Sequence, residues 1–201
     1  MTYDPRASSS PSRIASIERA VACRQFDFTV VLENVHDEHN VAAVLRSCDA
    51  VGIDEVHLVY HSGQELPVFG KKTSGGARKW VRQRKHDSVD ACFALLRESG
   101  YAIYVTRLDA SAVSLYDLDL TRPVALVFGN EHSGVTDHAA RMADGSVMIP
   151  QVGMVQSLNI SVACAVSVFE AARQRRAAGM YRKSQLGAEA YEATVQEWLQ
   201  R

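Results

Sequence analysis

The hydrophobic residues of this 201-residue chain alternate between short apolar runs and stretches with helical spacing. Apolar runs rich in β-branched residues predict strands at 28–33, 55–60, 101–106, 123–129 and 146–150. Apolar residues that recur every three or four positions predict helices at 13–24, 40–52, 88–99, 156–177 and 187–199. Because strands separated by helices are typical of βαβ units, we expect an α/β fold whose mostly parallel sheet carries helices on both faces.

The same pattern divides the chain into three parts. Residues 1–12 are rich in Ser and Pro and are expected to form a flexible tail. Residues 13–183 are expected to form one domain with a short helix at its start, because a hydrophobic content of 47% is enough to bury a full core. Residues 184–201 are expected to add a peripheral helical extension.

The composition favours a cytoplasmic protein. The four cysteines stand singly, without metal-binding spacing, which suits reduced thiols better than disulfides or a zinc site. They are Cys23, Cys48, Cys92 and Cys164. The first residues lack the apolar segment of a signal peptide, and no apolar run approaches the roughly 18 residues of a membrane span. We therefore expect neither a metal ion nor a membrane partner.

Candidate binding loops follow the predicted strands, since ligands of parallel α/β sheets bind at the carboxyl ends of the strands. The loops are ENVHDEHN (33–40), TRLDAS (106–111), GNEHSG (129–134) and PQVGMVQSLN (150–159). GNEHSG has the glycine spacing of a phosphate-binding loop, but Val135 stands where that loop requires lysine. It is either a glycine turn capped by Asn130 or a site that uses the carboxylate of Glu131.

Asn40 and Arg46 are the notable polar residues of the predicted helix 40–52. Asn40 is placed to cap the helix, because its side-chain oxygen can accept from the free amides of the first turn. Arg46 lies roughly 140° from the apolar stripe, counting about 100° per residue. A solvated arginine is the simpler interpretation, and a functional arginine is the alternative.

The predicted helix 156–177 begins with four polar residues in six positions, more than one cap requires. These residues, Gln156, Ser157, Asn159 and Ser161, either cap the helix or face a ligand. An apolar seam runs through Leu158, Val162, Ala165, Phe169 and Ala172. Because further valines widen this seam, we expect the helix to be central to the core or to form half of a subunit interface.

Basic residues concentrate in two segments, although the net charge is only −1. Residues 71–86 include seven Lys or Arg and residues 173–183 include five, with no acidic residue in either segment. This segregation favours an anionic partner such as RNA, with Trp80 and Tyr181 placed to stack on bases; solvated charged faces are the alternative. The candidate RNA contacts are Lys71, Lys72, Arg78, Arg173 and Arg176.

Three long stretches resemble the motifs of the SpoU class of RNA ribose 2′-O-methyltransferases, within the SPOUT superfamily. They are ENVHDEHNVAAVLRSCDAVGIDEVHLV, ALVFGNEHSGV and MIPQVGMVQSLNISVACAVSVFEA, in the order, spacing and strand–helix context of that class. The likeness covers about residues 14–183. Within the class, SGGARKWV and RQRRAAGMY are most similar to the TrmH type, which methylates the ribose of guanosine-18 in the tRNA D-loop.

The resemblance implies a SPOUT methyltransferase domain whose C-terminal part forms a deep trefoil knot, an exception to the usual absence of knots. It also implies a homodimer, tRNA rather than DNA as partner, and S-adenosylmethionine as methyl donor, with S-adenosylhomocysteine as product. By the same likeness, the cofactor-binding residues are Thr106, Gly129, Ile149, Ser157 and Leu158. The catalytic positions of the class match Arg46, Asn40, Glu131, Ser157 and Asn159.

The role that the mechanism of the SpoU class implies for Arg46 conflicts with the chemistry of a guanidinium group. That account makes the matching arginine the base, yet a guanidinium is effectively always protonated in proteins. We therefore expect Arg46 to orient the ribose 2′-oxygen and stabilise its developing negative charge, while a phosphate or water takes the proton.

Two other functions compete with this interpretation. One is the same chemistry on ribosomal RNA or another tRNA position, and the other is a non-catalytic RNA-binding module. Many SpoU enzymes of ribosomal RNA carry a separate N-terminal RNA-binding domain. Here only about 27 residues precede the first predicted strand, which favours tRNA.

Overall fold

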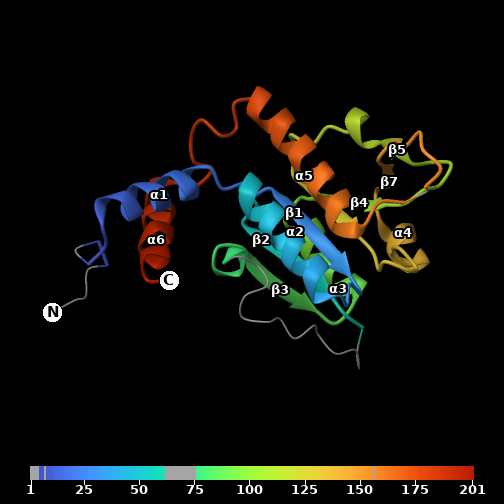
Figure 1. The fold of residues 1–201 in the computed structure, drawn as a ribbon, viewed down its shortest axis with the longest axis horizontal. Helices are drawn as coiled ribbons and strands as arrows, with labels where there is room; N and C mark the ends of the chain where they lie inside the picture. The colour runs from blue at the N-terminus through green and yellow to red at the C-terminus, as the bar shows by residue number, and fades with distance from the viewer. Residues whose placement is uncertain (1–4, 7, 62–75, 156) are drawn as a thin grey trace.

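The computed structural model describes residues 5–6, 8–61, 76–155 and 157–201. Its centre is a seven-stranded sheet in which every paired strand runs parallel to its neighbour (Figure 1). The strands are β1 (Phe28–Glu33), β2 (Glu55–Val59), β3 (Arg82–His86), β4 (Ala102–Thr106), β5 (Val113–Ser114), β6 (Val124–Phe128) and β7 (Gly145–Met148). Their order across the sheet is β3-β2-β1-β6-β4-β7-β5. The predicted α/β class is therefore confirmed.

Helices cover both faces of this sheet, as the sequence predicts (Figure 1). The α-helices are α1 (Pro11–Ala22), α2 (Glu38–Val51), α3 (Val89–Glu98), α4 (Asp137–Met142), α5 (Ile160–Ala177) and α6 (Ala188–Leu199). The described residues also form two short 3-10 turns, η1 (Ala77–Lys79) and η2 (Leu115–Asp117). Helices α2 and α5 share one hydrophobic core with one face of the sheet, while α3 and α4 share a second core with the other face.

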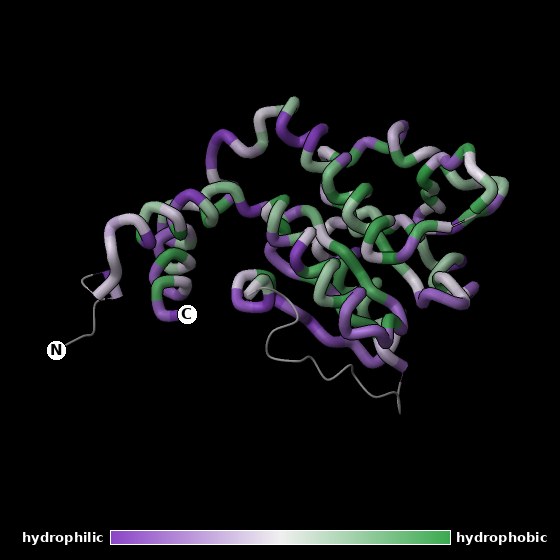
Figure 2. The backbone as a smooth tube through the Cα atoms, viewed as in Figure 1, coloured by the Kyte–Doolittle hydropathy of each residue, from purple (hydrophilic) through white to green (hydrophobic). Residues whose placement is uncertain are grey.

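Alternating side chains of the central strands supply the two cores. Along β1, Val30 and Leu32 belong to the core under α2 and α5, whereas Val31 belongs to the core under α3. All residues of β1 and β6 are buried, as expected for strands that are covered on both faces. Figure 2 shows β1 as predominantly hydrophobic, in contrast to the hydrophilic edge strand β3.

Three elements are missing from the sequence-based prediction: β3, β5 and α4. Strand β3 has the sequence RQRKH, which offers no apolar periodicity, and it is held by its parallel register with β2. A charged edge strand is a common protection against pairing with other chains. The two residues of β5 and the six of α4 are too few to produce a recognisable pattern.

Helix α2 starts two residues before its predicted start. Asp37 caps it, since the Asp37 carboxylate accepts from the backbone amide of His39 over 2.8 Å. The prediction that Asn40 is the cap is therefore wrong, and the Asn40 side chain is available for other contacts. The predicted end at Gly52 is confirmed, because Gly52 adopts a φ of 85° at the C-cap.

Helix α5 starts at Ile160 with Asn159 as its cap, so the predicted start at 156 is wrong. Ser157 precedes the helix, and Gln156 lies outside the described residues. The predicted seam also divides: Val162 and Phe169 are exposed, whereas another stripe, which includes Cys164 and Val168, packs into the core. The apolar character of α5 thus serves a core on one side and an exposed surface on the other.

The two terminal helices, α1 and α6, pack against each other at one end of the molecule (Figure 1). Helix α1 already begins at Pro11, inside the segment expected to be a tail, and Arg6 pairs with Glu18 of α1 and Glu192 of α6. Trp198 of α6 lies 5.0 Å from Trp80, between ring centres. No helix in the described part of the chain combines the length and the apolarity that crossing a bilayer would require.

Candidate functional site

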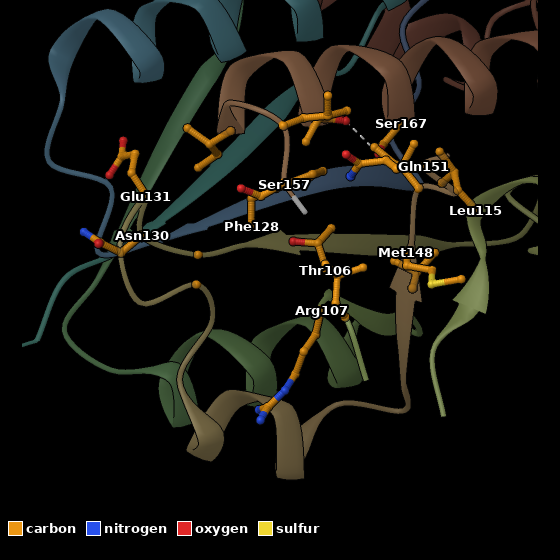
Figure 3. Close-up of a pocket in the computed structure, with 18 of the residues that line it drawn as sticks. Thr106, Arg107, Leu115, Phe128, Asn130, Glu131, Met148, Gln151, Ser157 and Ser167 are labelled. Carbon is orange, nitrogen blue, oxygen red and sulfur yellow. Dashed lines mark hydrogen bonds between the residues drawn. The ribbon is translucent and has the colours of Figure 1, made fainter. Parts of the chain in front are cut away.

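A cavity of about 380 Å³ opens at the carboxyl edge of the sheet, next to the start of α5 (Figure 3). Its walls come from the ends of β4, β6 and β7, from the loop after β6 and from the segment before α5. This volume lies within the roughly 300–1,000 Å³ typical of small-ligand sites. Its position at the carboxyl ends of the strands is the one expected for ligands of a parallel α/β sheet.

All five residues predicted to bind the cofactor line this one cavity. They are Thr106, Gly129, Ile149, Ser157 and Leu158. The Thr106 hydroxyl donates to the carbonyl of Val127 over 3.0 Å, which fixes the end of β4 against β6. Figure 3 shows Thr106 and Ser157 directed toward the middle of the cavity. Sequence reasoning therefore selected residues from four separate segments that the fold brings together.

The backbone at Gly129 leaves no room for a side chain. A Cβ atom there would lie 2.0 Å from the carbonyl carbon of Gly134 and 2.0 Å from the amide nitrogen of Val135. Asn130 and Gly134 exchange two backbone hydrogen bonds, of 3.0 and 2.8 Å, which close this loop tightly. The loop GNEHSG is thus a compact glycine turn, as one of the two interpretations predicts, and its backbone forms one wall of the cavity.

A chain of side-chain hydrogen bonds runs beside the cavity through Asn40. The Asn40 amide nitrogen donates to Glu131 Oε1 over 2.9 Å, and the Asn159 amide nitrogen donates to Asn40 Oδ1 over 3.1 Å. The Asn159 oxygen in turn accepts from the backbone amide of Ser161 over 2.8 Å and caps α5. Three of the five predicted catalytic residues therefore form one network between α2, the Gly129–Gly134 loop and α5.

Arg46 stands apart from this network. It lies on α2 six residues after Asn40, which corresponds to about 9 Å along the helix axis and about 120° around it. Its side chain is exposed, is not part of the cavity wall, and makes no hydrogen bond or ion pair with any of the described residues. The guanidinium is therefore left free to meet a partner that approaches from solvent.

Glu33 is a buried carboxylate at this edge that sequence reasoning did not select as a site residue. It is 1% exposed at the end of β1 and accepts from the amide of Thr136 over 2.9 Å and from its hydroxyl over 2.6 Å. The Thr136 hydroxyl also caps α4. Glu33 thus anchors the segment that follows the Gly129–Gly134 loop. The sequence signal that could have identified Glu33 is a charged residue at the end of an apolar strand.

Tyr60 is a second buried polar group close to the network. Its hydroxyl donates to the carbonyl of Val35 over 2.6 Å. Burial, reinforced by the negative charge of Glu131, raises the pKa of Tyr60 to about 12. The phenol therefore remains neutral at ordinary pH and acts as a donor that fixes the loop between β1 and α2.

The predicted RNA contacts are only partly described. Lys71 and Lys72 lie outside the described residues, while Arg78, Arg173 and Arg176 are all exposed. Arg173 is already paired with Glu170, an acidic neighbour that lies just before the basic segment.

The two aromatic residues expected to stack on bases are engaged within the chain. Trp80 packs against Trp198, and the Tyr181 hydroxyl donates to the carbonyl of Val51 over 2.7 Å. The Arg176 guanidinium lies 5.5 Å from the centre of the Tyr181 ring. Both aromatic side chains therefore have structural roles.

A parallel sheet with a ligand cavity at its carboxyl edge defines a broad class of α/β enzymes, and comparison with known proteins narrows it. The model of the SpoU rRNA Methylase family matches residues 27–169. The chain is 46% identical over 190 residues to a tRNA (guanosine(18)-2′-O)-methyltransferase of Thermus thermophilus, covering 94% of this chain and 97% of that protein. This chain therefore belongs to the SpoU rRNA Methylase family.

Solved structures agree with this assignment. The TrmH/SpoU tRNA modifying enzyme of Aquifex aeolicus superposes with a TM-score of 0.87 at 33% identity, covering 94% of this chain and 95% of that one. An S-adenosylmethionine-bound rRNA methyltransferase from Sinorhizobium meliloti gives a TM-score of 0.66 at 28% identity, covering 80% of this chain and 60% of the other.

Proposed function

We propose that this chain transfers a methyl group from S-adenosylmethionine to the ribose 2′-hydroxyl of guanosine-18 in the tRNA D-loop. The observation that carries the proposal is the 46% identity to the Thermus thermophilus guanosine-18 enzyme, because that match extends over 97% of the relative. The site supports it independently, since the residues expected to bind the methyl donor line one cavity.

The cavity suits a nucleoside that is held largely by backbone groups. Its wall includes the backbone at Gly129, where a Cβ atom would collide with the loop, together with the apolar side chains of Ile149 and Leu158. Apolar walls with a few placed polar groups are typical of cofactor sites. Thr106, Gly129, Ile149, Ser157 and Leu158 would hold S-adenosylmethionine, which supplies an electrophilic methyl group when bound.

The remaining residues of the site orient the nucleophile. In the transfer, the ribose 2′-oxygen forms a bond to the methyl carbon as the carbon–sulfur bond breaks, and the hydroxyl proton leaves. Asn40, Glu131 and Asn159 form the rigid network beside the cavity, and such preorganisation lowers the barrier by positioning. Ser157 contributes a polar group to the cavity wall.

Arg46 is the residue that we assign to the RNA. Its exposed guanidinium can bind a phosphate and the 2′-oxygen together, and binding a phosphate favours its charged form. A protonated arginine cannot accept the proton, so the RNA phosphate or a water molecule takes it. Arg46 then stabilises the negative charge that develops on the oxygen.

Methyl transfer to matched tRNA transcripts tests the proposal. We expect label from S-adenosylmethionine to enter an unmodified transcript and to be absent from a transcript whose guanosine-18 is replaced. Equal labelling of both would reject the position while keeping the chemistry. Donor binding without transfer to either transcript would redirect the search to ribosomal RNA, and absence of donor binding would support a non-catalytic RNA-binding module.

We further propose that the enzyme is a homodimer built on α5. Val162 and Phe169 of α5 are 47% and 55% exposed, and Val152, Met154 and Val155 of the preceding loop are exposed as well. Val162 and Phe169 are seven positions apart and therefore lie on one face of α5, and exposed apolar side chains that share a face are typical of protein interfaces. A second copy of this chain would bury them, and the resemblance to the SPOUT superfamily independently implies a dimer.

The remaining expectations belong to the same proposal. We place the methyltransferase domain at 13–183, with 184–201 as an extension whose helix packs on α1. The trefoil knot is implied by the resemblance and stays a prediction. Because the proposed substrate is tRNA, we expect the enzyme to act in the cytoplasm. Arg78, Arg173 and Arg176, together with Lys71 and Lys72, remain the candidate RNA contacts.

A further inference from the structure

Two histidines and a cysteine lie close together near the β3 edge of the sheet, away from the strands that form the cavity. His57 lies on β2, His86 ends the edge strand β3, and Cys92 lies on α3. One ring nitrogen of each histidine and the sulfur of Cys92 all lie within 4.8 Å of one another. The cavity described above is built from β4, β6 and β7, so this cluster takes no part in it.

The fold explains why these residues meet. The register pairs His57 with Arg84 and Val59 with His86, so the two histidines are diagonal neighbours on adjacent strands. Cys92 and Val59 belong to the core under α3, which covers this face. His57 and His86 are 29 positions apart in the sequence, so the cluster does not form a recognisable metal-binding motif.

The side chains have the chemistry of a zinc-type ligand set. Imidazole nitrogen and thiolate sulfur are the preferred ligands of Zn²⁺, and three protein ligands leave one tetrahedral position for water. Cys92 is fully buried, and His57 is 4% exposed, while His86 is half-buried and gives access from solvent.

The two histidine nitrogens require only a small adjustment to accommodate an ion, and the sulfur of Cys92 lies within 4.8 Å of both. Nδ1 of His57 and Nε2 of His86 lie 2.9 Å apart and share a hydrogen bond. Tetrahedral coordination at about 2.0–2.1 Å per bond places two nitrogens about 3.3 Å apart. The rings would therefore separate by about 0.4 Å and exchange their hydrogen bond for two bonds to the metal.

Glu55 lies near the second ring nitrogen of His57, beyond hydrogen-bonding distance, and also pairs with Arg84. Its Oε2 lies 3.7 Å from Nε2 of His57, which leaves Nδ1 to face His86 and the ion. A carboxylate that accepts a hydrogen bond from the second ring nitrogen fixes the tautomer of a metal-bound histidine, and Glu55 would take this role only by moving closer.

We propose that His57, His86 and Cys92 form a binding site for one divalent transition-metal ion of the zinc type, which joins β2, β3 and α3. The sulfur–metal bond forms as the thiol proton passes to solvent. This site goes beyond the methyl transfer and does not depend on it.

Cobalt binding provides the sharpest test, because tetrahedral Co²⁺ absorbs in the visible range and a thiolate ligand adds a near-ultraviolet charge-transfer band. The full-length protein without a histidine tag is freed of metal with a chelator and titrated with Co²⁺, and Zn²⁺ is then added as a competitor. We expect one equivalent of Co²⁺ to bind, with both spectral features, and Zn²⁺ to abolish them.

Variants assign the ligands. Cys92→Ser should lose the charge-transfer band, and His57→Asn and His86→Asn should bind at least about tenfold more weakly. The matched controls are Cys23→Ser, a thiol outside the cluster, and His138→Asn, an exposed histidine paired with Asp90. Circular dichroism and methyl transfer report on folding in each variant. Absence of stoichiometric binding, or spectra that are unchanged by all three substitutions, would overturn the proposal.

Discussion

The side-chain amide of Asn40 donates a 2.9 Å hydrogen bond to the carboxylate of Glu131, 91 positions further along the chain. Its oxygen accepts from Asn159 over 3.1 Å, so one amide joins three segments. An asparagine side chain suits this position because it offers a donor and an acceptor at once. An aspartate has the same shape but offers only acceptors when ionised, which makes it an informative substitution.

We expect Asn40→Asp to lower kcat for methyl transfer by about 10- to 100-fold, because the substitution removes a donor and places a negative charge beside Glu131. The affinity for S-adenosylmethionine should change little, since Asn40 is not part of the cavity wall. Single-turnover rates and calorimetric binding separate the two effects. His39→Asn, on the exposed neighbour in the same turn, is the control. An unchanged kcat would contradict a role for the network.

Arg46→Ala should abolish methyl transfer and leave binding of S-adenosylmethionine intact. Arg46→Lys should remain strongly impaired, because an ammonium group lacks the planar fork that binds a phosphate and an oxygen together. Both variants are assayed for turnover and for donor binding, with Ser47→Ala as the neighbouring control. Near-normal methylation by Arg46→Ala would refute both the positioning role and the alternative in which this residue is the base.

Gly129→Ala should destabilise the protein and weaken donor binding. The added Cβ would lie 2.0 Å from the backbone of Gly134, so the loop that forms one cavity wall must move. Steric overpacking of this kind costs about 1–3 kcal/mol. Gly187→Ala is the matched control, because its added Cβ would have no neighbour within 4 Å and its φ of −65° suits any residue. Thermal unfolding and donor affinity should respond to the first substitution and remain unaltered in the second.

The pattern of the sequence was sufficient for the central elements but not for the edges. Strands β1 and β6 carry apolar runs that are buried on both faces, β2 is buried after its first residue, and β4 alternates buried and half-buried residues; each of these signals is local. Strand β3 exists only because β2 provides it with a backbone partner, a long-range condition that RQRKH does not encode by itself. The start of α5 was mispredicted for another reason. A polar residue before an apolar stretch, such as Asn159, can be the cap of the helix or lie inside its first turn.

Motif resemblance predicted individual site residues, and the alternation of strands and helices predicted which loops would hold the site. The cavity residues Gly129 and Leu158 come from two different class motifs, whereas Thr106 lies between those motifs and begins one of the candidate loops that follow predicted strands. Resemblance did not show that Asn40 is a bridge rather than a cap, because hydrogen-bond partners depend on side-chain geometry. Glu33 was not predicted as a site residue for a related reason, because its hydrogen-bond partner Thr136 lies 103 positions away in the sequence.

Phe169→Asp should convert the proposed dimer into a monomer. The side chain is 55% exposed on α5 in the single chain, and a buried carboxylate at an apolar interface would be strongly unfavourable. Phe169→Leu keeps the apolar surface and should remain dimeric. Sedimentation equilibrium gives the mass directly, and circular dichroism confirms that both variants fold. A monomeric unsubstituted protein, or a dimeric Phe169→Asp variant, would reject this interface.

The ionisation of Glu170 should make the free energy of unfolding depend on pH in the acidic range. Hydrogen bonding to the Arg173 guanidinium, aided by Gln174, lowers the pKa of Glu170 below its ordinary value of 4.5, against the opposing effect of burial. A carboxyl group with a depressed folded-state pKa adds stability above its unfolded pKa, and this contribution is lost as the pH falls through the folded-state value.

We therefore expect the free energy of unfolding of the unsubstituted protein to exceed that of Glu170→Gln at pH 7, and this difference to shrink as the pH falls below about 4.5. Urea unfolding at a series of pH values measures it. The comparison with Glu170→Gln is needed because other carboxylates also titrate in this range. Their contributions to the free energy of unfolding are the same in both proteins and cancel in the difference. Asp90→Asn, which affects an exposed carboxylate paired with His138 on another surface, shows what an exposed pair contributes. A difference between the unsubstituted protein and Glu170→Gln that stays constant from pH 7 to about 3 would mean that the Glu170–Arg173 pair does not lower this pKa.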